Sequence, residues 1–478
     1  MKKAYLIIDI GTGNVRVALV ETDGRILWVG RDNVVYHRDD QYDEALYFDP
    51  AFLWQQIVRL TREALTKHES IELVAATASS QREGIVLLDK EGKGVVGFPN
   101  HDQRGRYLED TIADKDAVYN LTGRYPTALF SAMKLAAYRD KYPEEWQQID
   151  CFVSISDWAQ YQLTGIKAYE HAQASETLLY DVQQKSWSAQ LLALFDLPAD
   201  IVPELRFAGT KLGPLTEAIA DTLGLTQAVP VLVGGADTQL AVKSTRPDPG
   251  DVVLVSGTTT PVVKVTDAYV LDKQQRSWTN SHLDKTQFIL ETNCGVTGLN
   301  YQRIKEIFYP QDSYGCMEDE IDQLAAPNCF AHLGSLLADD KSYVTRGGFL
   351  FPVPIMTGLS RADFAWAGLW DIACSIKENL DCLMDIHPVQ TDYLWCCGGG
   401  FQSRHLRRYV AALTGKKLLL RTGYDQASVS GAAVVCSEVL GHKEKLDDTM
   451  EVVEPSDEPK YQQWYQQWKQ TRETLKQM

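Results

Sequence analysis

The chain has 478 residues, 45% of them hydrophobic, and a formal net charge of −17. This length is too great for one ordinary hydrophobic core and predicts two domains of about 200 residues or slightly more each. The acidic balance argues against binding to a nucleic-acid backbone, which needs a positively charged surface.

The nine cysteines are odd in number and irregular in spacing, and no signal peptide is recognisable. That pattern is typical of reduced thiols in the cytoplasm rather than of a disulfide framework. No apolar run approaches the ~20 residues that a membrane helix needs, so we expect no membrane partner and no nucleic acid. A homodimer is compatible with the sequence, which leaves the oligomeric state open.

Alternating apolar and polar residues predict strands in the first part of the chain, at 5–9, 15–21, 26–29, 73–77, 85–89 and 95–98. The first three, joined by short turns, form a β-meander. Asp49 and Pro50 precede an apolar pattern at helical spacing, which predicts a helix over residues 52–67. The stretch from 105 to 225 is expected to be mostly helical.

The opening pattern returns near residue 229, where a predicted strand again runs into glycines and an aspartate. The elements expected in this half are strands at 229–233, 252–255, 261–265 and 393–396, an apolar helix at 425–440 and a solvated terminal helix at 456–478. The second half thus repeats the first. We divide the chain into an N-terminal domain, residues 1–235, and a C-terminal domain, residues 236–478.

Three segments that combine glycine with polar residues follow apolar, strand-like runs: Asp9–Asn14, Gly234–Gln239 and Cys397–Ser403. A strand that ends in Gly, Asp or Thr can direct backbone N–H groups and a carboxylate at phosphates and their metal. One such turn could be an ordinary β-turn. Three of them, in both halves, indicate one nucleotide held between two related domains.

Two turns are candidates for the phosphates of that nucleotide. The first offers N–H and hydroxyl donors from Gly11, Thr12, Gly13 and Asn14, with Arg16 placed to reach the transferred phosphoryl group. The second would hold the other side of the triphosphate through Ser256, Gly257, Thr258 and Thr259. No P-loop motif is present to supply this role.

Two aspartates carry the predicted chemistry. Asp9 and Asp237 are the candidate ligands of Mg²⁺, which prefers carboxylate and water oxygens. Asp237 is also the candidate general base that accepts a proton from the attacking hydroxyl, and its neighbour Thr238 is a candidate substrate contact. The alternative for Asp237 is a helix N-cap, a position that Asp fills well.

A polar cluster follows two of the predicted strands and comprises Gln81, Arg82, Glu83, Asn100 and Asp102. Such a set suits a polyhydroxyl ligand, because every hydroxyl must be paired once it leaves water. The alternative is a group of exposed loop charges.

Gly398, Gly399 and Gly400 permit the close approach of a flat ring, and Gln402 and Ser403 follow them. This segment is our candidate adenosine site. The alternative is a strand-to-helix turn that needs glycine for a positive φ.

The order and spacing of these segments resemble the FGGY family of carbohydrate kinases over essentially the whole chain. The resemblance implies an α/β, two-domain, actin-like (ribonuclease-H-like) ATPase fold with mixed sheets flanked by helices. It implies ATP and Mg²⁺ as cofactors, Asp237 as the catalytic base, and the two turns and the glycine segment as the ATP site. It also places Arg82, Glu83 and Asp102 at sugar-contacting positions.

Within the family, the motifs at 81–87, 100–104 and 155–158 look most like those of autoinducer-2 kinases, and others are similar to fuculose kinases. The expected reaction is ATP-dependent phosphorylation of a hydroxyl on a small sugar or open-chain polyol. The acceptor could be a ketose such as xylulose or fuculose, or an autoinducer-2-type pentanedione. A non-catalytic sensor of sugar or nucleotide on the same fold is the alternative, and a protein-binding actin-like ATPase is a second rival.

Overall fold

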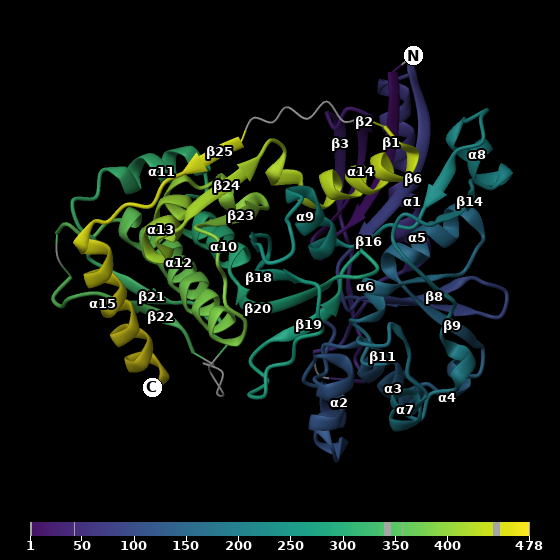
Figure 1. Cartoon of the computed structure of the whole chain (residues 1–478), viewed down its shortest axis with the longest axis horizontal. Helices are drawn as coiled ribbons and strands as arrows, with labels where there is room; N and C mark the ends of the chain where they lie inside the picture. Colours follow the sequence, from purple (N-terminus) through teal and green to yellow (C-terminus); the bar gives the residue numbers. More distant parts are fainter. Residues whose placement is uncertain (1, 43, 339–345, 356, 443–449, 478) are drawn as a thin grey trace.

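Two lobes lie side by side in this computed structural model, each built around one mixed β-sheet (Figure 1). The structure describes residues 2–42, 44–338, 346–355, 357–442 and 450–477. Within these ranges, no helix is both long enough and apolar enough to cross a bilayer.

The first sheet comprises β1 (Lys2–Ile10), β2 (Asn14–Glu21), β3 (Ile26–Asn33), β6 (Ile71–Ser80), β14 (Lys211–Pro214), β15 (Pro230–Leu232) and β16 (Gly235–Ala236). Its order is β14–β15–β6–β1–β2–β3, with β16 also paired to β6. Strands β1, β6 and β15 run parallel, β1 to β3 form an antiparallel meander, and β14 is antiparallel to β15.

The second sheet comprises β17 (Val252–Val255), β18 (Thr259–Thr266), β19 (Trp278–Ser281), β20 (Phe288–Val296), β23 (Tyr393–Cys397), β24 (Lys417–Arg421) and β25 (Met450–Val453). Its order is β19–β20–β18–β17–β23–β24–β25. Strands β17, β23 and β24 run parallel, and the pairs β17–β18, β18–β20 and β24–β25 are antiparallel.

The two sheets therefore share one topology, with β17, β18 and β20 standing where β1, β2 and β3 stand in the first. In both, three parallel strands lie between an antiparallel edge strand and an antiparallel meander. The turn between β1 and β2 is thus equivalent to the turn between β17 and β18. This duplication is what the repeated sequence pattern predicted.

The outer faces of the sheets are covered by helices (Figure 1). The first sheet packs against α1 (Pro50–Lys67), α5 (Ile155–Thr164) and α8 (Glu217–Leu223), and the second against α10 (Gly298–Phe308), α12 (Arg361–Ile386), α13 (Arg404–Thr414) and α15 (Pro459–Lys476). Helix α1 is preceded by its N-cap, Asp49, whose carboxylate accepts a hydrogen bond from the Ala51 N–H at 2.8 Å.

Two helices lie at the junction of the lobes, α9 (Asp237–Thr245) and α14 (Ala427–Leu440). In α9, Leu240 belongs to a buried cluster with Ile7 of the first sheet, whereas Val242 belongs to one with Val253 of the second. A Cβ on Gly431 of α14 would come within 1.7 Å of the Leu240 carbonyl oxygen. The two helices can cross this closely only because Gly431 has no side chain.

The remaining elements include a small sheet of order β8–β7–β9 and surround the first lobe or extend the second. They are β4 (His37–Arg38), β5 (Leu46–Tyr47), β7 (Ile85–Asp89), β8 (Gly94–Phe98), η1 (Arg106–Thr111), α2 (Lys115–Thr122), α3 (Ser131–Lys141), α4 (Pro143–Trp146), β9 (Ile149–Ser154), β10 (Tyr169–Glu170), α6 (His171–Ala174), β11 (Tyr180–Asp181), β12 (Ser186–Trp187), α7 (Ala189–Leu194), η2 (Ala199–Ile201), β13 (Leu205–Arg206), α11 (Tyr314–Asp322), β21 (Phe330–His332), β22 (Gly348–Leu350), η3 (Gly399–Gln402) and η4 (Tyr424–Gln426).

Two expectations from the sequence need correction. The stretch from 105 to 225 is not mostly helical, because it also contains β9 to β14. Short apolar runs such as Ile149–Ser154 do not distinguish a strand from a buried helix segment. The terminal helix α15 is not solvated all round, since Tyr461, Trp468 and Leu475 are buried against the second lobe.

Candidate active site

The first phosphate turn joins β1 to β2 and is closed by a hydrogen bond of 2.9 Å from the Gly11 N–H to the Asn14 carbonyl. The Thr12 hydroxyl accepts a hydrogen bond from Asn100 Nδ2 at 2.9 Å. An added Cβ on Gly13 would meet nothing within 4 Å. The turn therefore borders open space and touches one member of the predicted sugar cluster.

Gln81 and Lys134 hold the loops around this turn. Gln81 Nε2 donates to the Gly11 carbonyl at 3.3 Å, and Gln81 Oε1 accepts from the Asn100 N–H at 2.9 Å. The buried Lys134 Nζ donates to the carbonyl oxygens of Glu83 at 2.9 Å and Asn100 at 3.3 Å. These bonds fix the position of the sugar-cluster backbone relative to the phosphate turn.

Asp9 lies fully buried at the end of β1 and forms an ion pair with Arg16. One of its oxygens, Oδ2, accepts a hydrogen bond from Ser428 Oγ at 2.9 Å, and Arg16 donates to Gln426 Oε1 at 3.1 Å. The other oxygen, Oδ1, is buried and has no hydrogen-bond partner among the described residues. The first turn is thus tied to the start of α14, and one carboxylate oxygen is left for a ligand.

Asp237 is the first residue of α9 and is partly exposed. Its Oδ1 accepts a hydrogen bond from the N–H of Thr238 at 2.6 Å. Burial raises the pKa of Asp237 to about 6, the positive charge of Arg82 opposes the rise, and the negative charge of Asp9 adds to it. Charged groups beside the phosphate turn and in the sugar cluster therefore both act on the Asp237 carboxylate.

The second phosphate turn joins β17 to β18. The Gly257 N–H donates to the Thr259 carbonyl at 2.9 Å, and the Thr258 carbonyl accepts from the Thr297 N–H at 3.1 Å. At its start, the Ser256 hydroxyl lies 3.3 Å from the hydroxyl of Thr260. The turn is therefore held from both sides, as a preorganised donor set must be.

The glycine segment packs directly onto the second turn. The Gly400 N–H donates to the Ser256 carbonyl at 3.0 Å, and a Cβ on Gly400 would meet Ser256 Oγ at 2.1 Å. Gly398 has φ +96°, and its Cβ would meet the Ser256 carbonyl oxygen at 2.3 Å. Only Gly399 has nothing within 4 Å of its Cβ position. Two glycines thus serve the packing of the turn, and one faces open space.

The side chains of the two polar residues after the glycines differ in how many hydrogen bonds they already make within the protein. Gln402 is exposed, and its Nε2 lies 3.5 Å from Asp425 Oδ2. Ser403 is the N-cap of α13: its hydroxyl donates to Glu318 Oε1 at 2.6 Å and accepts from the Leu406 N–H at 3.1 Å. The Ser403 side chain is therefore already satisfied within the protein.

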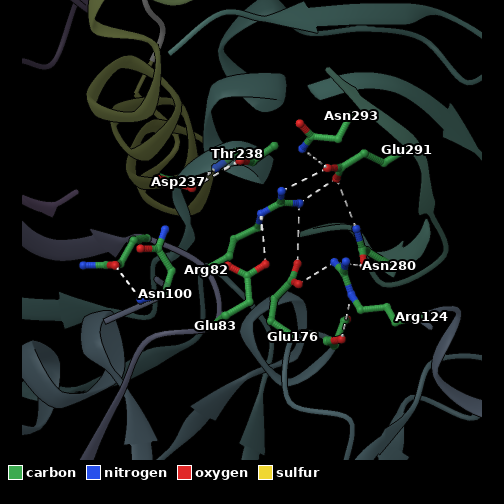
Figure 2. A network of polar contacts seen from close by, with 12 residues as sticks. Arg82, Glu83, Asn100, Arg124, Glu176, Asp237, Thr238, Asn280, Glu291 and Asn293 are labelled. Atoms are coloured by element: carbon green, nitrogen blue, oxygen red, sulfur yellow. Dashed lines mark hydrogen bonds and ion pairs between the residues drawn. The ribbon is translucent and has the colours of Figure 1, made fainter. Parts of the chain in front are cut away.

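Arg82 and Glu83 lie at the centre of a buried charge network (Figure 2). The Arg82 guanidinium donates to Glu291 through Nη1 at 2.6 Å and Nη2 at 2.9 Å, and its Nη1 lies 3.6 Å from Glu176 Oε1. The Glu83 carboxylate lies 3.9 Å from Arg82 Nε, beyond hydrogen-bond distance, and Glu83 has φ +58°. Glu83 therefore offers acceptor capacity that a ligand hydroxyl can use.

The network contains five side chains that sequence reasoning missed: Arg124, Glu176, Asn280, Glu291 and Asn293. Arg124 pairs with Glu176 and donates to Asn280, and Asn293 Nδ2 donates to Glu291 Oε1 at 2.9 Å. Glu291 and Asn293 come from β20, so the second lobe supplies one wall of the cluster. The available signal was Glu291 and Asn293 themselves, two strongly polar residues that lie two apart on one face of a strand that begins with three apolar residues.

The carboxylates of this network have different protonation tendencies. Burial raises the pKa of Glu176 to about 8, against the lowering effect of Arg124 and Arg82 and with help from the charges of Glu83 and Glu291. For Glu291, burial acts to raise the pKa, but the contact with Arg82 outweighs it and the pKa is lowered. Arg82 is thus held by an ionised partner, whereas burial opposes the ionisation of Glu176 despite its contact with Arg124.

Asp102 lies apart from this network. Its Oδ1 accepts from the Leu46 N–H at 2.8 Å and its Oδ2 from Arg104 Nε at 2.7 Å, and it is fully buried. Arg104 also pairs with Asp39 and stacks over Phe98, with its guanidinium carbon 3.8 Å from the ring centroid. Both oxygens of Asp102 are therefore engaged in holding the fold locally, which favours a structural role.

Comparison with known proteins supplies the family. The N-terminal domain of the FGGY family of carbohydrate kinases matches residues 4–243, and the C-terminal domain of that family matches residues 344–437. The chain belongs to the FGGY family of carbohydrate kinases. This FGGY kinase is 46% identical over 458 residues to "Putative sugar kinase YoaC" of Bacillus subtilis (strain 168), covering 95% of this chain and 94% of that protein.

More distant relatives also match this chain over most of its length. The FGGY kinase is 26% identical over 476 residues to the autoinducer-2 kinase of Salmonella paratyphi B, covering 93% of this chain and 87% of that protein. It superposes with TM-score 0.85 and 18% identity on a glycerol kinase from Plasmodium falciparum with ADP, covering 99% of this chain and 98% of that one. A xylulose kinase from Lactobacillus acidophilus gives TM-score 0.84 and 17% identity over 99% and 98% of the two chains.

The family resemblance and the actin-like ATPase fold expected from the sequence are both confirmed. The FGGY kinase is an ATP-dependent phosphotransferase that acts on a carbohydrate. Membership of this family therefore favours a catalytic kinase over the two alternatives, a non-catalytic sensor and a protein-binding ATPase.

Proposed function

We propose that this kinase transfers the γ-phosphoryl group of ATP to a hydroxyl of a small sugar or open-chain polyol, with Asp237 as the general base. The observation that carries the proposal is the position of Asp237 at the start of α9, at the junction of the lobes, where the charges of Arg82 and Asp9 both act on its carboxylate. A carboxyl with a pKa of about 6 is ionised at neutral pH. That value is also close enough to the working pH for efficient proton transfer.

On the ATP side, the two turns would hold the phosphates from the two lobes, Gly11–Asn14 from the first and Ser256–Thr259 from the second. Arg16 would face the transferred group. Gly399 and Gln402 would contact the adenosine, a role supported by the open space at Gly399 and the exposure of Gln402. Gly398, Gly400 and Ser403 would support that site through the contacts they already make.

Asp9 and Asp237 would hold Mg²⁺. The buried, unpartnered Oδ1 of Asp9 and the charge repulsion between the two aspartates fit a cation at this place. Among the described residues, no group of three or more His, Cys, Asp and Glu side chains is arranged to bind a metal. Water and phosphate oxygens would complete the coordination, as is usual for Mg²⁺, and the ion would neutralise charge on the transferred group.

On the acceptor side, Arg82, Glu83, Asp237 and Thr238 would contact the sugar, with Gln81 and Asn100 setting the loop. The similarity to autoinducer-2 kinases and the xylulose-kinase fold keep ketoses such as xylulose or fuculose, and autoinducer-2-type pentanediones, as the acceptors to test. We also propose a cytoplasmic location, which the nine free cysteines favour.

A coupled ADP-release assay over pentuloses, deoxyhexuloses, polyols and the autoinducer-2 precursor tests the proposal. We expect ADP release to depend on both ATP and one acceptor class, with phosphorylated product found by mass spectrometry. ATP and sugar binding without product formation would instead support the sensor alternative.

A further inference from the structure

The two segments that carry the proposed chemistry leave the ends of neighbouring strands. Strand β16 pairs in parallel with β6, and its last residue, Ala236, lies opposite Ser80 at the end of β6. The proposed base, Asp237, directly follows Ala236, and Arg82 of the sugar cluster comes two residues after Ser80. Helices α5 and α6 lie beside these strand ends (Figure 1). The position of the base relative to the sugar cluster therefore depends on how the two strand ends are held.

The chain that leads to Asp237 is held by a glutamine of α5. Gln160 is buried, and its side-chain oxygen Oε1 accepts a hydrogen bond from the Gly234 N–H at 2.9 Å. A Cβ on Gly234 would lie 1.8 Å from the Ala78 carbonyl oxygen of β6. Gly234 is thus packed against the backbone of β6 and hydrogen-bonded to α5, just before β16 begins.

The direction of the Gln160 amide is set by its other partners. Gln160 Nε2 donates to Asp157 Oδ1 at 3.2 Å and to the Ser156 carbonyl at 3.1 Å. Because both of these groups are acceptors, the amide nitrogen faces them and Oε1 is left for the Gly234 N–H. The other carboxylate oxygen of Asp157 accepts from the Glu170 N–H at 3.0 Å, at the start of α6. Asp157 therefore orients Gln160 and joins α5 to α6.

The end of β6 that leads to Arg82 is held by a second glutamine. Gln173 of α6 is buried, and its Nε2 lies 3.0 Å from Ser80 Oγ and 3.2 Å from Ser156 Oγ as a donor. Ser80 Oγ also accepts from the Ser156 N–H at 2.9 Å. Ser156 thus joins the two glutamines, since Gln160 binds its carbonyl and Gln173 its hydroxyl.

We propose that Gln160 and Gln173 are positioning residues for phosphoryl transfer, and that the buried network joining them fixes the base-bearing segment relative to the sugar-contacting one. The inference rests on the proposed function, because it takes Asp237 as the base and Arg82 as a sugar contact. Neither glutamine is a proposed contact of ATP or acceptor, so both act through the backbone that they hold. A misplacement of reacting groups by about 1 Å can lower a rate about 100-fold.

Two variants separate the two ends of the network. Gln160→Met keeps a side chain of similar length but removes the hydrogen bond to Gly234, which should displace the base. We expect kcat to fall at least about tenfold, with the KM values for acceptor and ATP within about twofold of wild type. Gln173→Met releases the end of β6 and should instead raise the KM for the acceptor at least about fivefold, with the KM for ATP unchanged.

Gln56→Met is the matched control. Gln56 is also a buried glutamine of the first lobe, and its Nε2 donates to the Asn33 carbonyl at 2.9 Å. Its loss should lower Tm as the other two changes do, but leave kcat and both KM values as in the wild type. Kinetics of Gln160→Met and Gln173→Met that match those of Gln56→Met, each measured well below its Tm, would make the glutamines purely structural and overturn the proposal.

Amide hydrogen exchange followed by mass spectrometry tests the positioning without any turnover. We expect faster exchange in peptides covering residues 234–238 for Gln160→Met and in those covering 79–83 for Gln173→Met, with neither changed in Gln56→Met. Unchanged exchange in the first two variants would overturn the proposal. If no acceptor is phosphorylated, or if Asp237→Asn keeps normal turnover, the proposed function fails, whereas the exchange rates still decide whether the glutamines hold the two segments.

Discussion

At the scale of single residues, the proposed reaction depends most directly on the carboxylate of Asp237, the proposed general base. We expect Asp237→Asn to lower kcat by roughly 10²–10⁴-fold, the usual contribution of a general base, while ATP binding and Tm change little. Coupled ADP release, ATP titration and thermal unfolding measure the three quantities. Turnover near the wild-type level in the Asn variant would contradict the assignment.

The pH dependence of the wild-type enzyme provides a second check on the same residue. Because burial raises the pKa of Asp237 to about 6, the group holds its proton below that pH and cannot act as a base. We expect kcat/KM for the sugar to rise through pH 6 and to level off near neutrality. A profile that stays flat down to pH 5 would show that another group takes the proton.

Glu83 is a proposed sugar contact, whereas both carboxylate oxygens of Asp102 are hydrogen-bonded within the protein. Changing each carboxylate to the matching amide compares the two residues. Glu83→Gln should lower kcat/KM for the sugar by an amount equivalent to about 1–3 kcal/mol, with little change in the KM for ATP. Asp102→Asn replaces a carboxylate that is hydrogen-bonded on both oxygens, so its main effect should be a lower Tm. An Asp102→Asn variant with normal Tm and impaired sugar kinetics would restore Asp102 to the sugar site.

At the scale of elements, the crossing of α9 and α14 should be sensitive to side-chain volume at Gly431. In an unhindered helix interior, Gly→Ala stabilises by about 1 kcal/mol. At Gly431 the new Cβ would collide with the backbone of Leu240, so we expect destabilisation by about 1–3 kcal/mol, the usual cost of overpacking.

Gly315→Ala in α11 is the matched control. There the nearest atom to the new Cβ is Ser313 Oγ at 3.5 Å, an ordinary contact. In urea unfolding, the change in the free energy of unfolding should therefore have opposite signs in the two glycine variants, with Gly431→Ala less stable and Gly315→Ala more stable than the wild type. Equal effects would mean that the helices can separate at no cost.

At the scale of the whole molecule, the two turns proposed to bind phosphate lie in different lobes, so both can hold one triphosphate only if the lobes approach each other. Closure would also exclude water from the reaction. We expect the radius of gyration from small-angle scattering to decrease when sugar and a non-hydrolysable ATP analogue are both bound. An unchanged profile with both ligands shown to be bound would contradict closure.

The sequence by itself determined the local elements and the segments that carry chemistry. Strands such as Tyr5–Asp9 and the turns after them could be predicted because side-chain alternation and glycine preference are local properties. The repeat of these patterns in the second half, together with the family motifs, was enough to predict the two-lobe fold and membership of a carbohydrate kinase family.

Only the tertiary structure decided which polar residues belong together. Glu83 and Asp102 are both acidic residues of the predicted sugar cluster. The Glu83 carboxylate lies 3.9 Å from Arg82 Nε and can still accept hydrogen bonds, whereas both oxygens of Asp102 accept hydrogen bonds from Leu46 and Arg104. Glu291 meets Arg82 from a strand more than 200 positions away, since |i−j| is 209 for that pair. The physical reason is that hydrogen-bond saturation and burial depend on neighbours brought by chain folding, which no local pattern encodes.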